Sequence, residues 1–285
     1  MKRISYFLVL IFFPFFSQGQ FAIGPRIGFH LNKTVIAEKD ERENFENSFK
    51  PGYEIGAKMA YILTKRFTFQ SEIYYSRKSR KWKILDAELK HEAVYHHLDF
   101  PLLLRLNIYK QTEVVSQNQY YLKVGPNFSY WLGGSGTLSG GELETFGDYN
   151  YKIVFGENKG EDNIMYIEDA NRLQVGFDLG AGALFQIIPN QFINVELSYI
   201  LGHTFLGERE SAQTKLLTFS DNLRASHRLF SISLAYLFGF DLGTQKAKQS
   251  SSKSGNKKTK KSKQLNSKQR SKKALKSIKK RKPGF

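Results

Sequence analysis

The stretch from Val94 to Ile108, VYHHLDFPLLLRLNI, alternates between two kinds of side chain at successive positions. Leu98 and Phe100 share one face with most of the leucines that follow, whereas Asp99 and Arg105 share the opposite face. A period of two is typical of a β-strand, because successive side chains point to opposite faces of a sheet. The stretch therefore predicts a strand with one apolar face and one charged face.

The same alternation recurs along the chain and predicts eight strands. They begin near Phe21, Pro51, Arg66, Val94, Gln119, Arg172, Gln191 and Arg228. Strands of outer-membrane barrels alternate in this way, with apolar side chains toward lipid and polar ones inside. We therefore expect an all-β fold, namely an eight-stranded antiparallel up-and-down transmembrane β-barrel with a disordered basic tail at its C-terminus.

The connections between these strands alternate in length. Short turns are expected at Thr64 and Lys65, over residues 110–118, and at Pro189 and Asn190. The long polar connections are expected over Lys33–Lys50, Lys81–Glu92, Gly133–Asn171 and Leu206–His227. Short turns on one side and long loops on the other are typical of outer-membrane barrels. This layout places the long loops outside the cell and both termini in the periplasm.

The polar faces of the strands predict a charged barrel interior. Its expected members are Arg26, Glu54, Lys58, Arg66, Glu72, His97, Asp99, Arg105, Lys123, Arg172, Asp178 and Glu196. Six basic residues face five acidic ones, and an unpaired buried charge costs several kcal/mol, so we expect a network of ion pairs. An eight-stranded interior is just wide enough to be filled by side chains, which argues against a general diffusion pore.

The chain ends differ in composition from the middle. Lys2 and Arg3, an apolar run and a small-residue site before Gln20 are typical of a secretory signal peptide over residues 1–19. Residues 20–243 then form the expected barrel domain. Residues 244–285 hold 17 of the 43 Lys and Arg residues and no Asp or Glu, so the other 26 basic residues match the 26 acidic ones. We expect this Lys-rich tail to be disordered.

The residue types exclude several kinds of chemistry. The chain has no cysteine, so disulfides, thiolate metal sites and cysteine nucleophiles are ruled out. The histidines show no established metal-ligand spacing, and we expect neither a metal nor a cofactor. Gly176, Gly180 and Gly182 fall at strand spacing and open no helix. They therefore indicate relief of crowding inside a narrow barrel and not a phosphate-binding loop.

Four stretches together form a family pattern: Leu98–Arg105, Tyr120–Pro126, the glycine-rich sixth strand and Leu234–Phe238. They resemble the PorT-like outer-membrane β-barrel proteins of Bacteroidetes, and the resemblance covers roughly residues 20–240. The resemblance implies an outer-membrane barrel. It implies no catalytic residues, and the family includes a protein needed for type IX secretion. The basic tail departs from this pattern, because such barrels usually end at the last strand.

These patterns favour a non-enzymatic protein in contact with outer-membrane lipid. Its long loops, above all Gly133–Asn171 with its aromatic residues, would contact an extracellular or secretion-machinery partner. In the periplasm the tail would bind a polyanion, either cell wall or anionic head groups. Export argues against nucleic acid as the partner.

Two alternatives stay open at this point. The first is a small barrel enzyme of the lipid-hydrolase or protease type, with His97 and Asp99 as base and orienting carboxylate, or Ser226 and His227 as nucleophile and base. The second is a soluble lipid-binding calyx, in which the two faces exchange and the apolar rows line a cavity. The bulky apolar rows argue against the calyx, because an eight-stranded interior offers too little room for them.

Overall fold

The computed structural model describes residues 20–38, 45–84, 88–108, 118–140, 147–207, 212–214, 217–221 and 223–241. The expected signal peptide over 1–19 and the basic tail over 244–285 lie outside these residues, as does most of the turn over 110–118. None of the described residues forms a helix that is long and apolar enough to cross a membrane.

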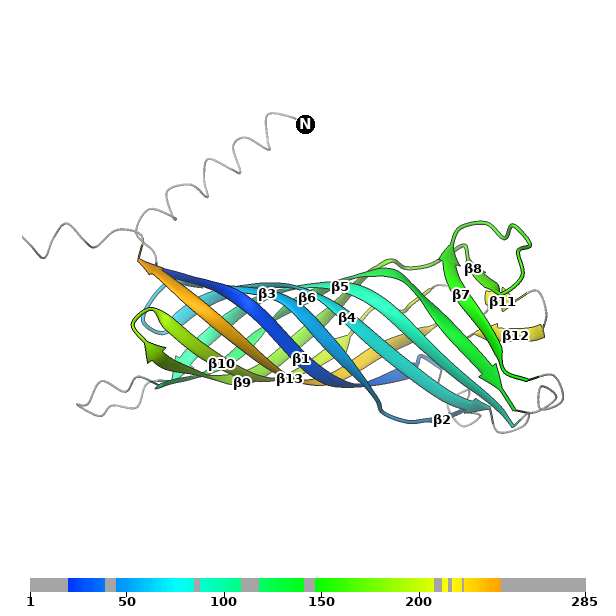
Figure 1. The fold of residues 1–285 in the computed structure, drawn as a ribbon, viewed down its shortest axis with the longest axis horizontal. Coiled ribbons are helices and arrows are strands. Elements are labelled where there is room, and N and C mark those ends of the chain that lie inside the picture. The colour runs from blue at the N-terminus through cyan, green and yellow to red at the C-terminus, as the bar shows by residue number, and fades with distance from the viewer. Residues whose placement is uncertain are drawn as a thin grey trace, which may run out of the picture. The chain divides into compact units, whose positions relative to one another are not determined.

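Within the described residues the fold is all-β, and eight long strands close into a ring (Figure 1). These strands are β1 (Gln20–Ile36), β3 (Lys50–Ile62), β4 (Phe67–Ile84), β5 (Leu89–Ile108), β6 (Asn118–Ser139), β9 (Leu173–Ile188), β10 (Gln191–Gly202) and β13 (Ala225–Asp241). Each pairs with the next in an antiparallel register, and β13 neighbours β1. The predicted ring of eight strands is confirmed.

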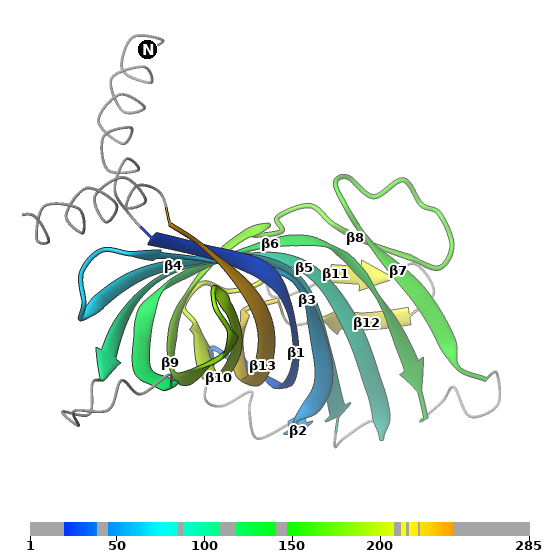
Figure 2. The same ribbon diagram turned by 60° about the vertical axis from the view of Figure 1, so that its left-hand side comes forward.

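Five short strands lie in the connections. They are β2 (Phe45–Asn47), β7 (Tyr149–Phe155), β8 (Ile164–Ile167), β11 (Ala212–Thr214) and β12 (Leu217–Asp221). β7 and β8 extend the main sheet beyond β6, whereas β11 and β12 form a separate pair. Figures 1 and 2 show β7, β8, β11 and β12 at the end of the barrel opposite to the end where β1 begins and β13 finishes. We call these the loop end and the terminal end.

The outer face of the ring is apolar. Phe29 is 68% exposed and Leu173 is 58% exposed, and large apolar residues follow at alternate positions of all eight strands. Aromatic rings meet near both borders of this apolar band: Phe21 stacks on Phe240 at the terminal end, and Tyr53 contacts Tyr75 toward the loop end. Rings at both borders are typical of barrels that sit in a bilayer. The charged rows face inward, which is the reverse of the calyx alternative.

The strands are longer than the alternation of charged and apolar residues predicted. The expected loop over Lys81–Glu92 is mostly wall, because β4 continues to Ile84 and β5 resumes at Leu89. The expected loop over Gly133–Asn171 contains the end of β6 and all of β7 and β8. Beyond the apolar band the outward side chains turn polar, so the contrast between the two faces disappears although the strand continues. That loss of contrast explains the misplaced strand ends.

Candidate functional site

The middle of the barrel interior holds a network of charged side chains from different strands. The Arg26 guanidinium contacts Glu54 at 2.6 Å and Glu72 at 2.9 Å. The Lys58 ammonium lies 3.2 Å from Glu72 and 2.7 Å from Glu196. These five side chains come from β1, β3, β4 and β10 and are buried. The network therefore joins opposite walls of the ring.

A second set of contacts continues the network toward β6 and β9. The Lys123 ammonium lies 2.9 Å from Glu196 and 3.6 Å from Asp178. The Tyr121 hydroxyl donates to Glu196 and accepts a hydrogen bond of 2.5 Å from the Asn194 amide. Glu196 thus accepts hydrogen bonds from two ammonium groups, a phenol and the Gln70 amide. A buried carboxylate needs this number of donors to offset its lost hydration.

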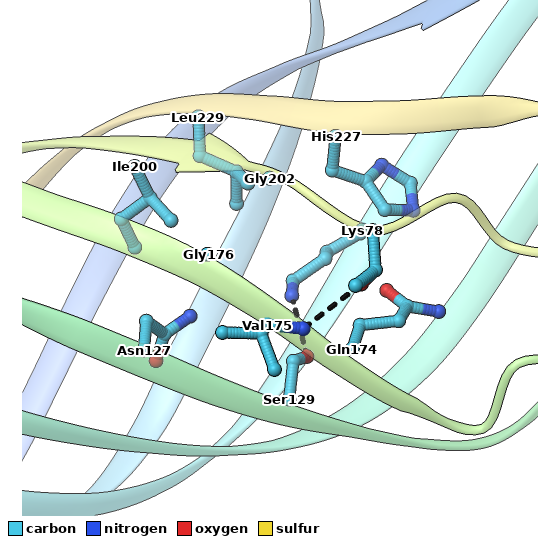
Figure 3. Close-up of a pocket in the computed structure, with 11 residues that line it drawn as sticks. Lys78, Asn127, Ser129, Gln174, Val175, Gly176, Ile200, Gly202, His227 and Leu229 are labelled. Atoms are coloured by element: carbon cyan, nitrogen blue, oxygen red, sulfur yellow. Dashed lines mark hydrogen bonds between the residues drawn. The ribbon is translucent and has the colours of Figure 1, made fainter.

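Closer to the loop end, a smaller polar cluster surrounds Lys78. Its ammonium donates to Asp99 at 3.0 Å and to Ser129 at 3.0 Å, and Ser76 also donates to Asp99. Figure 3 shows Lys78 and Ser129 directed toward each other, beside a cavity that His227 also lines. The cavity measures about 20 Å³, which is the size of a single water molecule. It is too small for an organic ligand.

Above this cluster, rings of histidine, tyrosine and tryptophan fill the interior. His97 stacks on Trp131 and meets His227 edge to face, with ring centroids 6.2 and 5.5 Å apart. His91 stacks on Tyr151 and forms a hydrogen bond with its hydroxyl. The rings are almost completely buried. This layer lies between the Lys78 cluster and the loop end.

The structure places ten of the twelve expected interior residues inside the ring, where they are buried. The prediction is wrong for Arg66, which is exposed in the turn before β4, where its backbone N–H donates to the Thr64 hydroxyl. It is also wrong for Arg172, which precedes β9 at the loop end, half-buried, with its guanidinium over the rings of Tyr130 and Phe155.

The sequence analysis did not predict two of the cations in the barrel interior. Lys78 and Arg80 are buried on the inward face of β4, and the Arg80 guanidinium lies 3.9 Å from the centre of the Trp82 ring. Both residues lie at even-numbered positions of β4, as Glu72 does, and this alternation could have identified them as inward-facing. They were missed because the strand was expected to end near them. With Lys78 and Arg80 inside in place of Arg66 and Arg172, six basic and five acidic residues are buried in the described part of the chain.

Neither residue pair considered for catalysis is joined by a hydrogen bond in the structure. His97 packs between rings, whereas Asp99 bonds Ser76 and Lys78. Ser226 is partly exposed and His227 is buried, as expected for neighbours on opposite faces of β13. Among the described residues, no group of three or more His, Asp or Glu side chains is placed to hold a metal ion.

The loop end has a core of its own and an open groove. Three of the loop aromatics expected to contact a partner pack inward here: Tyr151 is buried in the core, and Tyr149 and Phe155 flank it. Tyr166 lies on the other face of the sheet, beside Val154. The groove, of about 490 Å³, lies on β6, β7 and the start of β8. It is lined by Ser135, Gly136, Thr137, Asn150, Tyr151, Lys152, Asp162, Asn163 and Ile164, most of which carry polar side chains.

The family model described as outer membrane protein beta-barrel domain matches residues 16–204. The chain belongs to this family. Membership places the protein in the outer membrane, in agreement with the closed ring and its apolar outer face. The comparison with curated proteins returned no match. The narrower PorT-like assignment goes beyond what the family match shows.

Solved structures of outer-membrane barrels are similar to this chain at low identity. Ail, the attachment invasion locus protein of Yersinia pestis, is 12% identical with a TM-score of 0.34, covering 78% of this chain and 99% of its own. OprG of Pseudomonas aeruginosa is 10% identical with a TM-score of 0.42, covering 79% and 97%. The outer membrane enzyme PagL is 14% identical with a TM-score of 0.26, covering 75% and 98%. Similarity at this level does not indicate a shared function.

Proposed function

We propose that the protein is a non-enzymatic outer-membrane barrel that is closed along its axis and carries a binding platform at the loop end, outside the cell. The observation that supports this most directly is the filled interior. Charged side chains from opposite walls meet in buried ion pairs, and a layer of rings lies above them. A barrel filled in this way has no room for a ligand inside, so we expect it to bind ligands at its outer surfaces.

The platform is the sheet formed by the end of β6 with β7 and β8. Its core holds the groove in a fixed shape, and hydroxyl, amide and carboxylate side chains line that groove. Such groups pair with the hydroxyls of a saccharide, so we propose an extracellular saccharide as the ligand. Full-length protein in nanodiscs, applied to an array of bacterial glycans, should bind a defined subset. Asp162→Ala should abolish that binding, and an array without any specific signal would reject the ligand class.

The direction of the barrel can be tested because the chain has no cysteine. Lys159 is exposed between β7 and β8, and Lys65 is exposed in the terminal-end turn between β3 and β4. Intact cells carrying Lys159→Cys should react with a bulky, membrane-impermeant maleimide. Cells carrying Lys65→Cys should react only after the outer membrane is permeabilised. The opposite pattern would place the loop end in the periplasm and overturn the proposal.

We also propose that the protein is PorT-like, that its signal peptide is cleaved and that both termini lie in the periplasm. Its basic tail would bind a polyanion of the envelope. The 17 basic residues of the tail support the last point. Deleting the residues after Gly243 should reduce co-sedimentation with cell wall at low salt and have no effect at high salt. Unchanged co-sedimentation at low salt would discard the tail's role.

A further inference from the structure

The outer wall of the barrel carries a cluster of cations near the loop end. We call it the cationic wall patch, and it consists of Lys33 on β1, Lys50 on β3, Arg77, Lys81 and Lys83 on β4, and Lys90 on β5. The strand register places these residues on adjoining strands of one wall, with Lys83 opposite Lys90 and both about 20 Å from Arg77 along the strands. Figures 1 and 2 show β3, β4 and β5 as adjoining parts of one wall.

The patch begins where the lipid-facing band ends. Arg77 lies opposite Tyr53 in the register of β3 and β4, and Tyr53 is 42% exposed. Tyr75 and Ile73 lie two and four residues before Arg77 on β4, on the same face, and Ile73 is 45% exposed. Arg77 therefore stands about one side-chain row above the apolar band. This is the depth of lipid head groups, where the stems of Lys and Arg lie along apolar surface and their charges reach polar groups.

The charges of the patch are only partly matched by the protein. Within the described residues, the carboxylate that pairs with the patch is Glu92, 2.5 Å from Lys81 and 3.8 Å from Lys50. Glu46 occupies the register position opposite Lys83. Lys83 and Lys90 are themselves directly opposite each other. Like charges at directly opposed positions of two strands are destabilising, unless an anion lies between them.

We propose that the cationic wall patch binds the phosphate groups of anionic lipids in the leaflet at the loop end. Arg77 would take a phosphate through paired N–H donors, and Lys83 and Lys90 would share one as point charges. The acyl chains of the same lipid would lie on the apolar band below Arg77. The groove and the closed interior take no part in this binding, so the proposal stands independently of the proposed function.

The test uses full-length protein in mild detergent and native mass spectrometry. The probes are bisphosphorylated lipid A, dephosphorylated lipid A, phosphatidylglycerol and phosphatidylcholine. Wild-type protein should retain the two phosphate-bearing anionic lipids, and the ratio between them identifies the source of the phosphate. The double variant Arg77→Gln/Lys90→Gln should bind them roughly 30-fold more weakly, since each basic side chain at a membrane surface contributes about one kcal/mol.

A matched control removes the same charges elsewhere. Arg66 lies in the terminal-end turn and Lys159 at the loop tip, so Arg66→Gln/Lys159→Gln should bind lipid as the wild type does. The conservative double variant Arg77→Lys/Lys90→Arg should retain lipid binding. To check that each variant is folded, the mobility of unboiled samples in electrophoresis is compared with that of boiled samples. Equal weakening in both double variants would overturn the proposal. Equal binding of phosphorylated and dephosphorylated lipid A would overturn it as well.

Discussion

At the scale of single residues, Glu196 joins the two halves of the interior network. It contacts Lys58 of β3 and Lys123 of β6, and it accepts from the Tyr121 hydroxyl. The Tyr121 ring passes over Gly182, where an added Cβ would lie 2.4 Å from the ring. The predicted role of the strand glycines in relieving crowding is therefore confirmed at this position.

Removing the shared carboxylate should be costly. Glu196→Leu leaves Lys58 and Lys123 with less compensation, and breaking a buried ion pair by removing one partner costs roughly 3–5 kcal/mol. The free energy of unfolding in urea, measured in lipid vesicles, should fall by about that amount. Lys58→Met/Glu196→Leu should recover part of the loss, because it also removes one of the abandoned charges. A double variant less stable than Glu196→Leu would contradict this reading of the network.

The space at Gly182 provides a second residue-scale prediction. Gly182→Val forces its side chain into the Tyr121 ring and should destabilise the barrel by about 1–3 kcal/mol, as overpacking usually does. The measurement is the temperature at which the folded band disappears in electrophoresis. Ala181→Val is the matched control, since Ala181 faces outward next to it. The interpretation fails if both variants lose the folded band at the wild-type temperature.

At the scale of elements, the sheet of β6, β7 and β8 is built on side chains that alternate as regularly as those of the barrel. Ile153 of β7 is buried in the loop-end core, whereas its neighbour Val154 is 38% exposed. Sequence reasoning assigned this region to a loop because its outward face is polar. The inward residues, including Tyr151 and Met165, could have indicated strands, but only after the neighbouring wall was known.

This packing predicts how the loop end responds to a buried charge. Ile153→Asp places a carboxylate in an apolar core and should open β7 and β8 to protease in membrane fractions, while the barrel stays protected. Val154→Asp adds the same charge on the exposed face and should leave the digestion pattern of the wild type. Equal resistance of the two variants would show that the loop end does not depend on this core.

At the scale of the whole molecule, the period of two predicted the ring and most of the interior from the sequence. Parity alone assigns Asp99 and Arg105 to the interior, because a slip of one residue would move the whole apolar row inside. It could not assign Arg66 or Arg172, which carry the right parity but lie outside the strands. Nor could it find the groove or the cationic wall patch, because most of their residues lie in stretches that were expected to be loops and that the structure places on strands.

The apolar outer face also makes a prediction about insertion into lipid. Leu104 lies in the middle of the outward row of β5, 43% exposed. Leu104→Arg should reduce the stability of the barrel in a bilayer by about 2–4 kcal/mol, the usual cost of an arginine near the midplane. Thr137→Arg, above the apolar band on β6, is the control and should cost much less. Similar costs for the two would contradict the position of the band.

Whether the barrel is closed along its axis can be measured as conductance across a planar bilayer. Full-length protein is inserted at measured density, and current is recorded at fixed voltage in high salt. The interior network and the ring layer predict a current that stays at the baseline of the bare bilayer. Reproducible current steps of uniform size would show an open pore and contradict the account.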